Sequence, residues 1–131
     1  MVKKGELFPM SSVKSYRDLI VWQKSINLTE KIYVFTRQFP KEEIYGVVSQ
    51  MRRAATSIPA NIAEGQARNS RKEFIQFLGI AKGSLAELET FIILSERLNY
   101  IPESRSKELL TACEEISKLL NGLLRSLSTC R

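Results

Sequence analysis

Apolar side chains recur every three or four positions in four segments of the chain, and no run alternates as a β-strand would. That spacing is typical of amphipathic helices, each with one face turned toward a core. The third segment ends where Asn99 is followed by Pro102, a combination that commonly terminates a helix. The predicted helices cover residues 19–38, 41–65, 70–99 and 103–128.

Short connections join the predicted helices, so consecutive helices should run antiparallel. The fold class that follows is all-α, an up-down antiparallel four-helix bundle. Residues 1–14 lack the helical pattern and are expected to form a loose N-terminal arm, while residues 15–131 form a single domain. A chain of 131 residues is a suitable length for one domain.

Polar residues and glycine mark several of the predicted helix ends. Ser70 followed by Glu73 fits a capping box at the start of the third helix. Glu42 and Glu43 suit the positive N-terminus of the second helix. Gly65 is the residue type that most often ends a helix, so we place the C-terminus of the second helix there.

Pro59 conflicts with the helix predicted around it, because proline lacks the N–H that a helix interior requires. The apolar positions Ala55, Ile58 and Ile62 nevertheless stay in phase across it. We therefore expect a kink within one helix instead of a break. Asn61 lies close to this kink, and its side-chain amide is expected to satisfy the carbonyl that Pro59 leaves free.

The second and third predicted helices each carry a second face, opposite the apolar face expected in the core. The second face of the third helix includes Gly79 and Gly83, each costing ~1 kcal/mol relative to alanine in a helix interior. Such glycines are kept where another backbone approaches closely. One four-helix subunit cannot bury two faces on each helix, so we expect a homo-oligomer; small residues that merely face solvent are the alternative. The predicted subunit-interface residues are Gly46, Ser49, Thr56, Ala60, Gly79, Gly83, Ala86 and Thr90.

The composition removes several classes of chemistry, because histidine is absent and cysteine occurs only at positions 113 and 130. Histidine-based zinc sites, Ser–His and Cys–His nucleophile pairs, haem ligation by histidine and di-iron Glu-x-x-His bundles all need residues that the chain lacks. Cys113 and Cys130 fall on the fourth predicted helix, roughly 25 Å apart, which excludes a disulfide between them. We therefore expect no metal, no cofactor and no enzymatic activity.

The net charge is +6, from 20 Lys and Arg against 14 Asp and Glu. Basic residues gather within residues 46–72, where Glu64 is the one carboxylate, and residues 3–17 add further lysines and an arginine. A cluster of this kind suits the phosphates of a nucleic acid, with strong salt dependence and little sequence preference. The predicted nucleic-acid-binding residues are Arg52, Arg53, Arg68, Arg71 and Lys72.

Structural roles for these arginines are the alternative. Arg68 follows Glu64 by four residues, so the two can form a local ion pair. Arg53 and Glu64 cannot pair within one helix, and each is open to pairing across a subunit interface. No aromatic residue lies between Gly46 and Arg71, so a base-stacking platform is not indicated.

No apolar run is long enough to act as a signal peptide or a membrane helix. The longest uncharged stretch covers residues 54–63, whereas a membrane helix needs roughly 20 residues. We therefore expect a cytoplasmic protein without a membrane partner.

Three stretches of the sequence are distinctive: DLIVWQK at residues 18–24, SQMRRAATSIPANIAEG at 49–65 and KEFIQFLGIAKGSLAELET at 72–90. Together they closely resemble the bacterial four helix bundle protein family, also called the 23S rRNA-intervening sequence proteins. The resemblance covers about residues 15–128 and leaves out only the N-terminal arm.

This resemblance implies an up-down four-helix bundle that assembles into a ring-like homopentamer and has no known enzymatic activity. Some members are encoded within intervening sequences of large-subunit ribosomal RNA genes. A related protein is the accessory variability determinant of diversity-generating retroelements, a pentamer that binds its reverse transcriptase and nucleic acid. The matching arginines here are Arg52 and Arg53.

Two functions remain as hypotheses. In the first, a non-enzymatic oligomer binds RNA, DNA or a ribonucleoprotein through its basic surface. In the second, the oligomer is a scaffold that recruits a protein partner, such as a reverse transcriptase, and has no direct nucleic-acid role.

Overall fold

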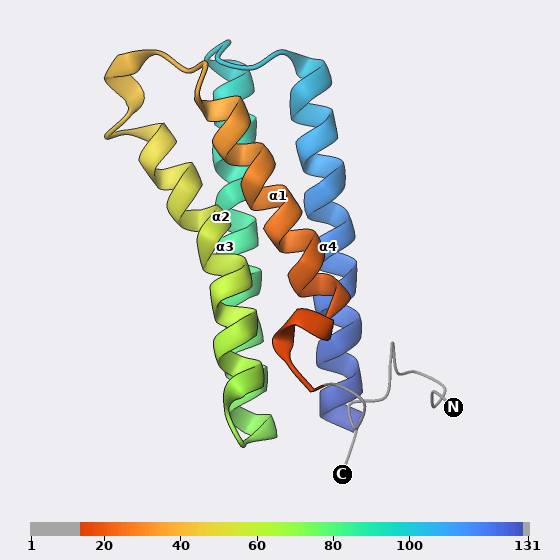
Figure 1. Cartoon of the computed structure of the whole chain (residues 1–131). Helices are drawn as coiled ribbons and strands as arrows, with labels where there is room; N and C mark the ends of the chain where they lie inside the picture. The colour runs from red at the N-terminus through yellow and green to blue at the C-terminus, as the bar shows by residue number, and fades with distance from the viewer. Residues whose placement is uncertain (1–13, 130–131) are drawn as a thin grey trace.

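The computed structural model describes residues 14–129 and places them in four α-helices, with no β-strand in that range. Figure 1 shows the helices side by side along one long axis, with each helix running opposite to the one before it. The all-α prediction is confirmed, whereas the predicted N-terminal arm lies, apart from Lys14, outside the described residues. The elements are η2 (Tyr16–Asp18), α1 (Ile20–Thr36), η3 (Lys41–Glu43), α2 (Val47–Ala67), α3 (Arg71–Arg97) and α4 (Glu103–Thr129).

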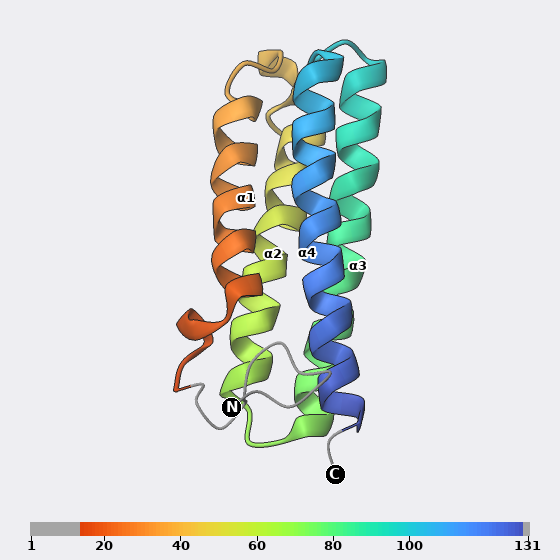
Figure 2. The same ribbon diagram turned by 90° about the vertical axis from the view of Figure 1, so that its right-hand side faces the viewer.

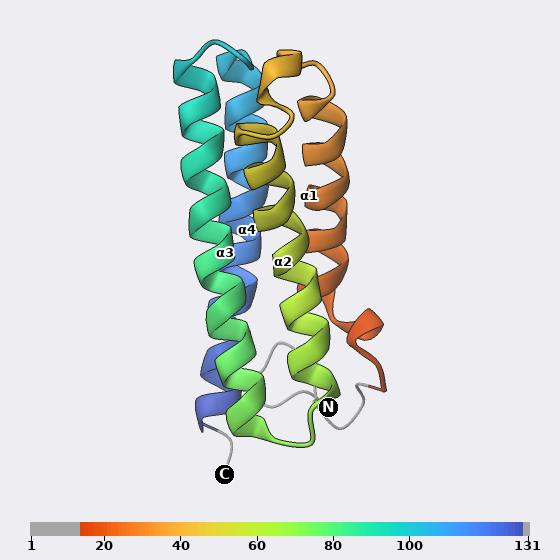
Figure 3. The same ribbon diagram turned by 90° about the vertical axis from the view of Figure 1, so that its left-hand side faces the viewer.

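Each helix turns one apolar face toward a shared core, as the periodicity predicts. Two polar contacts join the antiparallel helices α2 and α3. The hydroxyl oxygens of Ser57 and Ser84 lie 2.8 Å apart, and the Ser95 hydroxyl oxygen, which lies 2.7 Å from the Phe91 carbonyl, is also 3.4 Å from the Met51 sulfur. Figures 2 and 3 show the same helices from the two sides of the molecule. The core side chains of α2 and α4 include Met51, Ala55, Ile58, Ile62, Leu109, Cys113, Ile116, Leu120, Leu123 and Leu127.

The N-terminus of α2 lies at Val47, so the prediction that this helix begins after Pro40 is wrong. Pro40 is followed instead by η3 and a turn, which leaves Ile44 47% exposed. The Glu43 carboxylate folds back over the helix start and accepts the Val47 N–H at 3.5 Å. A negative group is stabilised at this position by the positive end of the helix. Glu43 therefore caps α2 from outside the helix.

Glu43 also ties the turn to the far end of α3. The Tyr100 hydroxyl donates to Glu43 Oε2 at 2.6 Å, and the Tyr100 ring packs against Phe39 with the ring centroids 5.3 Å apart. The hydrogen bond to the Glu43 carboxylate raises the pKa of Tyr100 above its ordinary value. Tyr100 therefore holds the segment between α1 and α2 at two points, at Phe39 near its start and at Glu43 near its end.

The C-terminus of α2 extends two residues past Gly65, so the assignment of Gly65 as the terminating glycine is also wrong. Gly65 is buried at the place where α3 approaches α2. A Cβ atom at this position would lie 2.7 Å from Phe77 Cβ and 3.0 Å from Phe74 Cδ1. Gly65 is required for close packing of the two helices.

The ends of α3 agree with the sequence. The Ser70 side chain accepts the Glu73 N–H at 3.2 Å, which is the serine half of the predicted capping box. At the other end Asn99 adopts a left-handed conformation with φ of 62°. The N–H of Tyr100 then bonds the Ser95 carbonyl and that of Asn99 bonds the Glu96 carbonyl. This pairing is a Schellman motif, which satisfies the last carbonyls of the helix.

α2 continues through Pro59 as one helix, and in Figure 1 its N-terminal half is inclined to its C-terminal half. A proline at position 59 leaves the carbonyl of Ala55 without its helical donor. The Thr29 hydroxyl of α1 supplies the missing hydrogen, at 3.0 Å from that oxygen, while also lying 2.8 Å from the Ser25 carbonyl. Asn61, the residue predicted for this role, instead donates to the Ser57 carbonyl at 2.8 Å.

Replacing Thr29 with valine is expected to destabilise the protein by roughly 1–3 kcal/mol, because it removes the hydroxyl that donates to the Ala55 carbonyl. Urea unfolding followed by circular dichroism measures this change in free energy. The same substitution in a Pro59→Ala background should cost less, since the restored N–H of residue 59 reaches the carbonyl. Equal costs in both backgrounds would refute the assignment of the Thr29 bond to the proline.

Candidate nucleic-acid interface

The five basic residues predicted to bind nucleic acid occupy two separate places on the chain. Arg52 and Arg53 lie in the N-terminal half of α2, whereas Arg68, Arg71 and Lys72 surround the turn between α2 and α3. At 1.5 Å per helical residue, Arg52 and Arg68 are separated by roughly 24 Å along the helix axis. Figure 1 shows the turn at one end of the molecule. The cluster seen in the sequence is therefore not one patch on a single chain.

Arg52 is held against α1 by three contacts. Its Nε donates to the Thr36 hydroxyl at 3.0 Å, and its Nη2 donates to the Tyr33 carbonyl at 3.4 Å. The guanidinium carbon also lies 4.6 Å from the centre of the Tyr33 ring, within the range of a cation–π contact. Arg52 thus joins α2 to α1, and its charge has a fixed position at the surface.

Arg53, the next residue, is exposed and makes no hydrogen bond or ion pair with any residue in the range 14–129. Glu64, the one carboxylate within residues 46–72, is paired with Arg68, with 2.8 Å between Nη2 and Oε2. The alternative local ion pair between Arg68 and Glu64 is therefore confirmed. Arg53 retains a guanidinium that is available to an external anion.

The Arg68 guanidinium also lies over the Phe77 ring, 5.2 Å from its centre. Because both members of the Arg68–Glu64 pair are about half exposed, the ion pair contributes little to stability, on the order of 0.3–0.5 kcal/mol. Arg68 is positioned mainly by this local packing at the end of α2. Its charge is partly balanced by Glu64, unlike that of Arg53.

Further basic residues lie at the same end of the molecule as the α2–α3 turn. Lys72 is exposed and has no hydrogen-bond or ion-pair partner among the described residues, and Arg71 is exposed beside it. η2, which contains Arg17, packs against α1 and α2, and Figure 2 shows it in the half of the molecule that holds the α2–α3 turn. The Asp18 carboxylate accepts the backbone N–H of Lys14 at 3.0 Å and that of Ser15 at 3.2 Å, and the second bond completes a capping box at η2. This end of the molecule is basic.

The residues predicted to contact a second subunit lie on exposed or half-exposed surface of α2 and α3, except Gly46, which is the N-cap of α2 and where an added Cβ would meet the Glu43 carboxylate of the same chain. An added Cβ at Gly79 or Gly83 would meet no atom within 4 Å. The exposed Thr56 and Thr90 turn their hydroxyls to carbonyls of their own helices at 2.9 Å, so neither needs a polar partner across the face. Near these residues α3 also exposes large apolar side chains. They are Ile80, Ile93 and Leu94.

One hollow beside Arg53 was missed by the sequence reasoning. It has a volume of about 320 Å³, and Tyr45, in the turn before α2, stands at its edge 94% exposed. The sequence has no aromatic residue between Gly46 and Arg71, but Tyr33 and Tyr45, which lie outside that stretch, line this hollow together with the arginines. The signal was Tyr45 itself, one residue before Gly46. The lining residues are Tyr33, Ile44, Tyr45, Val48, Ser49, Arg52, Arg53 and Thr56.

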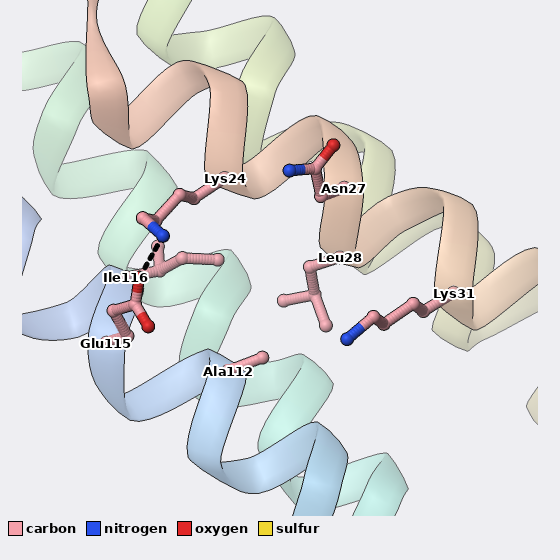
Figure 4. Close-up of a pocket in the computed structure, with 7 residues that line it drawn as sticks. All are labelled: Lys24, Asn27, Leu28, Lys31, Ala112, Glu115 and Ile116. Atoms are coloured by element: carbon pink, nitrogen blue, oxygen red, sulfur yellow. Dashed lines mark ion pairs between the residues drawn. The ribbon is translucent and has the colours of Figure 1, made fainter.

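A smaller pocket of about 150 Å³ lies between α1 and α4 (Figure 4). Lys24 reaches across it to an ion pair with Glu115, and Lys31 lies 3.5 Å from Glu108 beside it. Its apolar floor includes Leu28 of α1 and residues of α4. Both lysines are paired with carboxylates of α4. The polar side chains at this pocket therefore serve to join α1 to α4.

Metal ligation and thiol chemistry depend on the Cys, Asp and Glu residues in the range 14–129. This range contains no group of three or more His, Cys, Asp or Glu that could hold a metal ion. Burial raises the pKa of the Cys113 thiol to about 12, so this side chain stays protonated and unreactive at neutral pH. Cys130 lies outside the described residues. No helix in the described part of the chain combines the length and apolarity needed to cross a membrane.

Comparison with known proteins agrees with the four-helix architecture. A crystal structure of a protein of unknown function from the S23 ribosomal protein family of Bacteroides thetaiotaomicron superposes with a TM-score of 0.73. The two chains are 30% identical over 81% of this chain and 99% of the other. No curated protein matches. The model of the 23S rRNA-intervening sequence protein family matches residues 17–122. The chain therefore belongs to the 23S rRNA-intervening sequence protein family.

Proposed function

We propose that this chain is a non-enzymatic, cytoplasmic homo-oligomer that binds nucleic acid or a ribonucleoprotein through its basic surface. Each subunit would be an up-down four-helix bundle, and the family resemblance suggests five subunits. The observation that carries the proposal is that Arg53 and Lys72 are exposed without hydrogen-bond or ion-pair partners in residues 14–129, on a chain of net charge +6.

Side-chain cations without an ion-pair partner contribute most to the affinity for a polyanion, because no existing ion pair has to be broken. When Lys or Arg neutralises a phosphate, condensed counterions are released, and this release supplies most of the affinity at low salt. Arg53 and Lys72 give up no existing ion pair on binding. An oligomer would repeat both side chains on every subunit, and simultaneous binding at several subunits converts weak single sites into a higher overall affinity.

The test is a pair of double variants that remove the same charge. Arg53→Ala with Lys72→Ala should weaken binding of mixed-sequence RNA and DNA at about 50 mM salt and should flatten its salt dependence, by about 0.7–0.9 in log–log slope for each phosphate that is no longer neutralised. The control is Lys107→Ala with Lys118→Ala, whose lysines already face Glu103 and Glu114. Fluorescence anisotropy across a salt series measures both.

The control variant is expected to bind nearly as wild type does, and both variants should keep the wild-type mass and melting temperature. Equal weakening in the two variants would mean that net charge alone matters and would remove the site assignment. Unchanged binding in Arg53→Ala with Lys72→Ala would remove it as well.

A protein-interaction scaffold is the second candidate, favoured by the exposed apolar residues of α3. Its occupant would be a protein partner, such as a reverse transcriptase, instead of RNA or DNA. A wild-type protein that binds neither RNA nor DNA at about 50 mM salt would favour this candidate over the first, because phosphate contacts are strongest at low salt.

A further inference from the structure

The turn before α2 holds Tyr45 at a defined place on the surface. Glu43 anchors this turn through the Tyr100 hydroxyl at 2.6 Å and through the N-terminus of α2. Ile44 is also half exposed, so the turn buries neither of its two large side chains in the core. The ring of Tyr45 is 94% exposed, which leaves both of its faces open. An exposed aromatic ring on an anchored turn is suited to stacking.

Cationic groups line the same hollow as this ring. Arg52 is fixed by its hydrogen bonds to Thr36 and Tyr33. Its guanidinium therefore already has a defined position before any ligand binds. Arg53 lies next to it and has no hydrogen-bond or ion-pair partner among the residues described. The first turn of α2 forms part of the wall, and helix N-termini favour anions. The hollow therefore combines an aromatic face with positive charge.

We propose that this hollow binds single-stranded nucleic acid, with an unpaired base stacked on Tyr45 and the adjacent phosphate bound by Arg53. The proposal rests on the proposed function and adds to it that the nucleic acid is single-stranded and that one base is contacted. Ser49 and Thr56 line the hollow and are also predicted interface residues, so the proposal requires a subunit interface that leaves Tyr45 and Arg53 uncovered. Aromatic stacking beside a basic groove is the arrangement by which proteins hold single strands without sequence preference. A duplex cannot use the ring, because its bases are already stacked within the helix. The volume of the hollow, about 320 Å³, is at the low end of the range for small-ligand pockets. A volume of this size suits one base.

The experiment compares a fluorescein-labelled single-stranded RNA with a duplex RNA of equal length, at about 50 mM salt where phosphate contacts are strongest. Tyr45→Ala should weaken single-strand binding roughly 5- to 150-fold, as expected when one base no longer stacks, and leave duplex binding within about twofold. Tyr45→Phe keeps the ring and should bind as wild type. Arg53→Ala should weaken binding of both probes, since both carry phosphate.

Each other outcome has a definite meaning. If wild type binds both probes and Tyr45→Ala changes neither, the stacking site is refuted while the proposed function stands. If wild type binds neither probe, the proposed function itself fails. If Tyr45→Ala lowers the mass of the protein in light scattering, the ring belongs to an interface between copies of this chain and the proposal is wrong.

Discussion

Arginine in place of Gly83 is expected to reduce the mass of the protein in solution to the 15.0 kDa of a single chain. Within one chain nothing lies within 4 Å of a Cβ at this position, so the long side chain fits an isolated subunit without a clash. In the proposed oligomer the small surface around Gly83 would face another backbone, and an arginine would hold the two subunits apart. Multi-angle light scattering at micromolar concentration measures the mass.

The matched control is Asn121→Arg, which adds the same side chain at an exposed position of α4. This variant should keep the wild-type mass, and both variants should unfold cooperatively in thermal scans. A wild-type mass of 15.0 kDa would refute the oligomer altogether. An oligomeric Gly83→Arg variant would instead move the subunit interface away from this face of α3.

Valine in place of Gly65 is expected to destabilise the fold by about 3 kcal/mol, the largest stability change foreseen for a single substitution on α2. Even a Cβ would stand 2.7 Å from Phe77 Cβ, and the branched side chain adds two more methyl groups at the same place. Relief requires α3 to move away from α2, which opens gaps in a packed core. Equilibrium unfolding in urea measures the change in free energy.

Ala67→Val is the control for Gly65→Val, because it places the same side chain two residues further along α2 at an exposed position. Its expected cost is only the helix-propensity difference, about 0.5 kcal/mol. Similar costs for the two variants would show that valine in this helix, and not the approach of α3, causes the destabilisation.

The three- to four-residue spacing of apolar side chains predicted the four helices and their core faces. This was possible because each turn of a helix places one or two side chains in the core. The start of α3 was also predictable, since Ser70 acts on Glu73 only three residues away. Both ends of α2 were mispredicted for a tertiary reason. Its first turn is capped by Glu43, which is also held by Tyr100 from the end of α3. At its other end Gly65 is needed for the packing of α3, a role that looks like helix termination in the sequence.

The candidate site shows the same division between local and long-range information. The pairing of Arg68 with Glu64 was foreseeable because four helical residues separate them. The binding of Arg52 to Thr36 was not, because it depends on how α1 packs against α2. The place of Tyr45 beside the arginines was not predictable, because it lies outside the basic stretch of the sequence. The hollow that brings these residues together is assembled from α1, the turn and α2.

The hydrogen bond between Thr29 and the Ala55 carbonyl has an evolutionary consequence for the family. The Thr29 hydroxyl lies 3.0 Å from the carbonyl that Pro59 leaves without its helical donor, so we expect the two positions to change together among relatives. A homologue whose helix carries a residue with an N–H at the position of Pro59 is free to place an apolar side chain opposite it. An alignment of the family should therefore show covariation between these two positions.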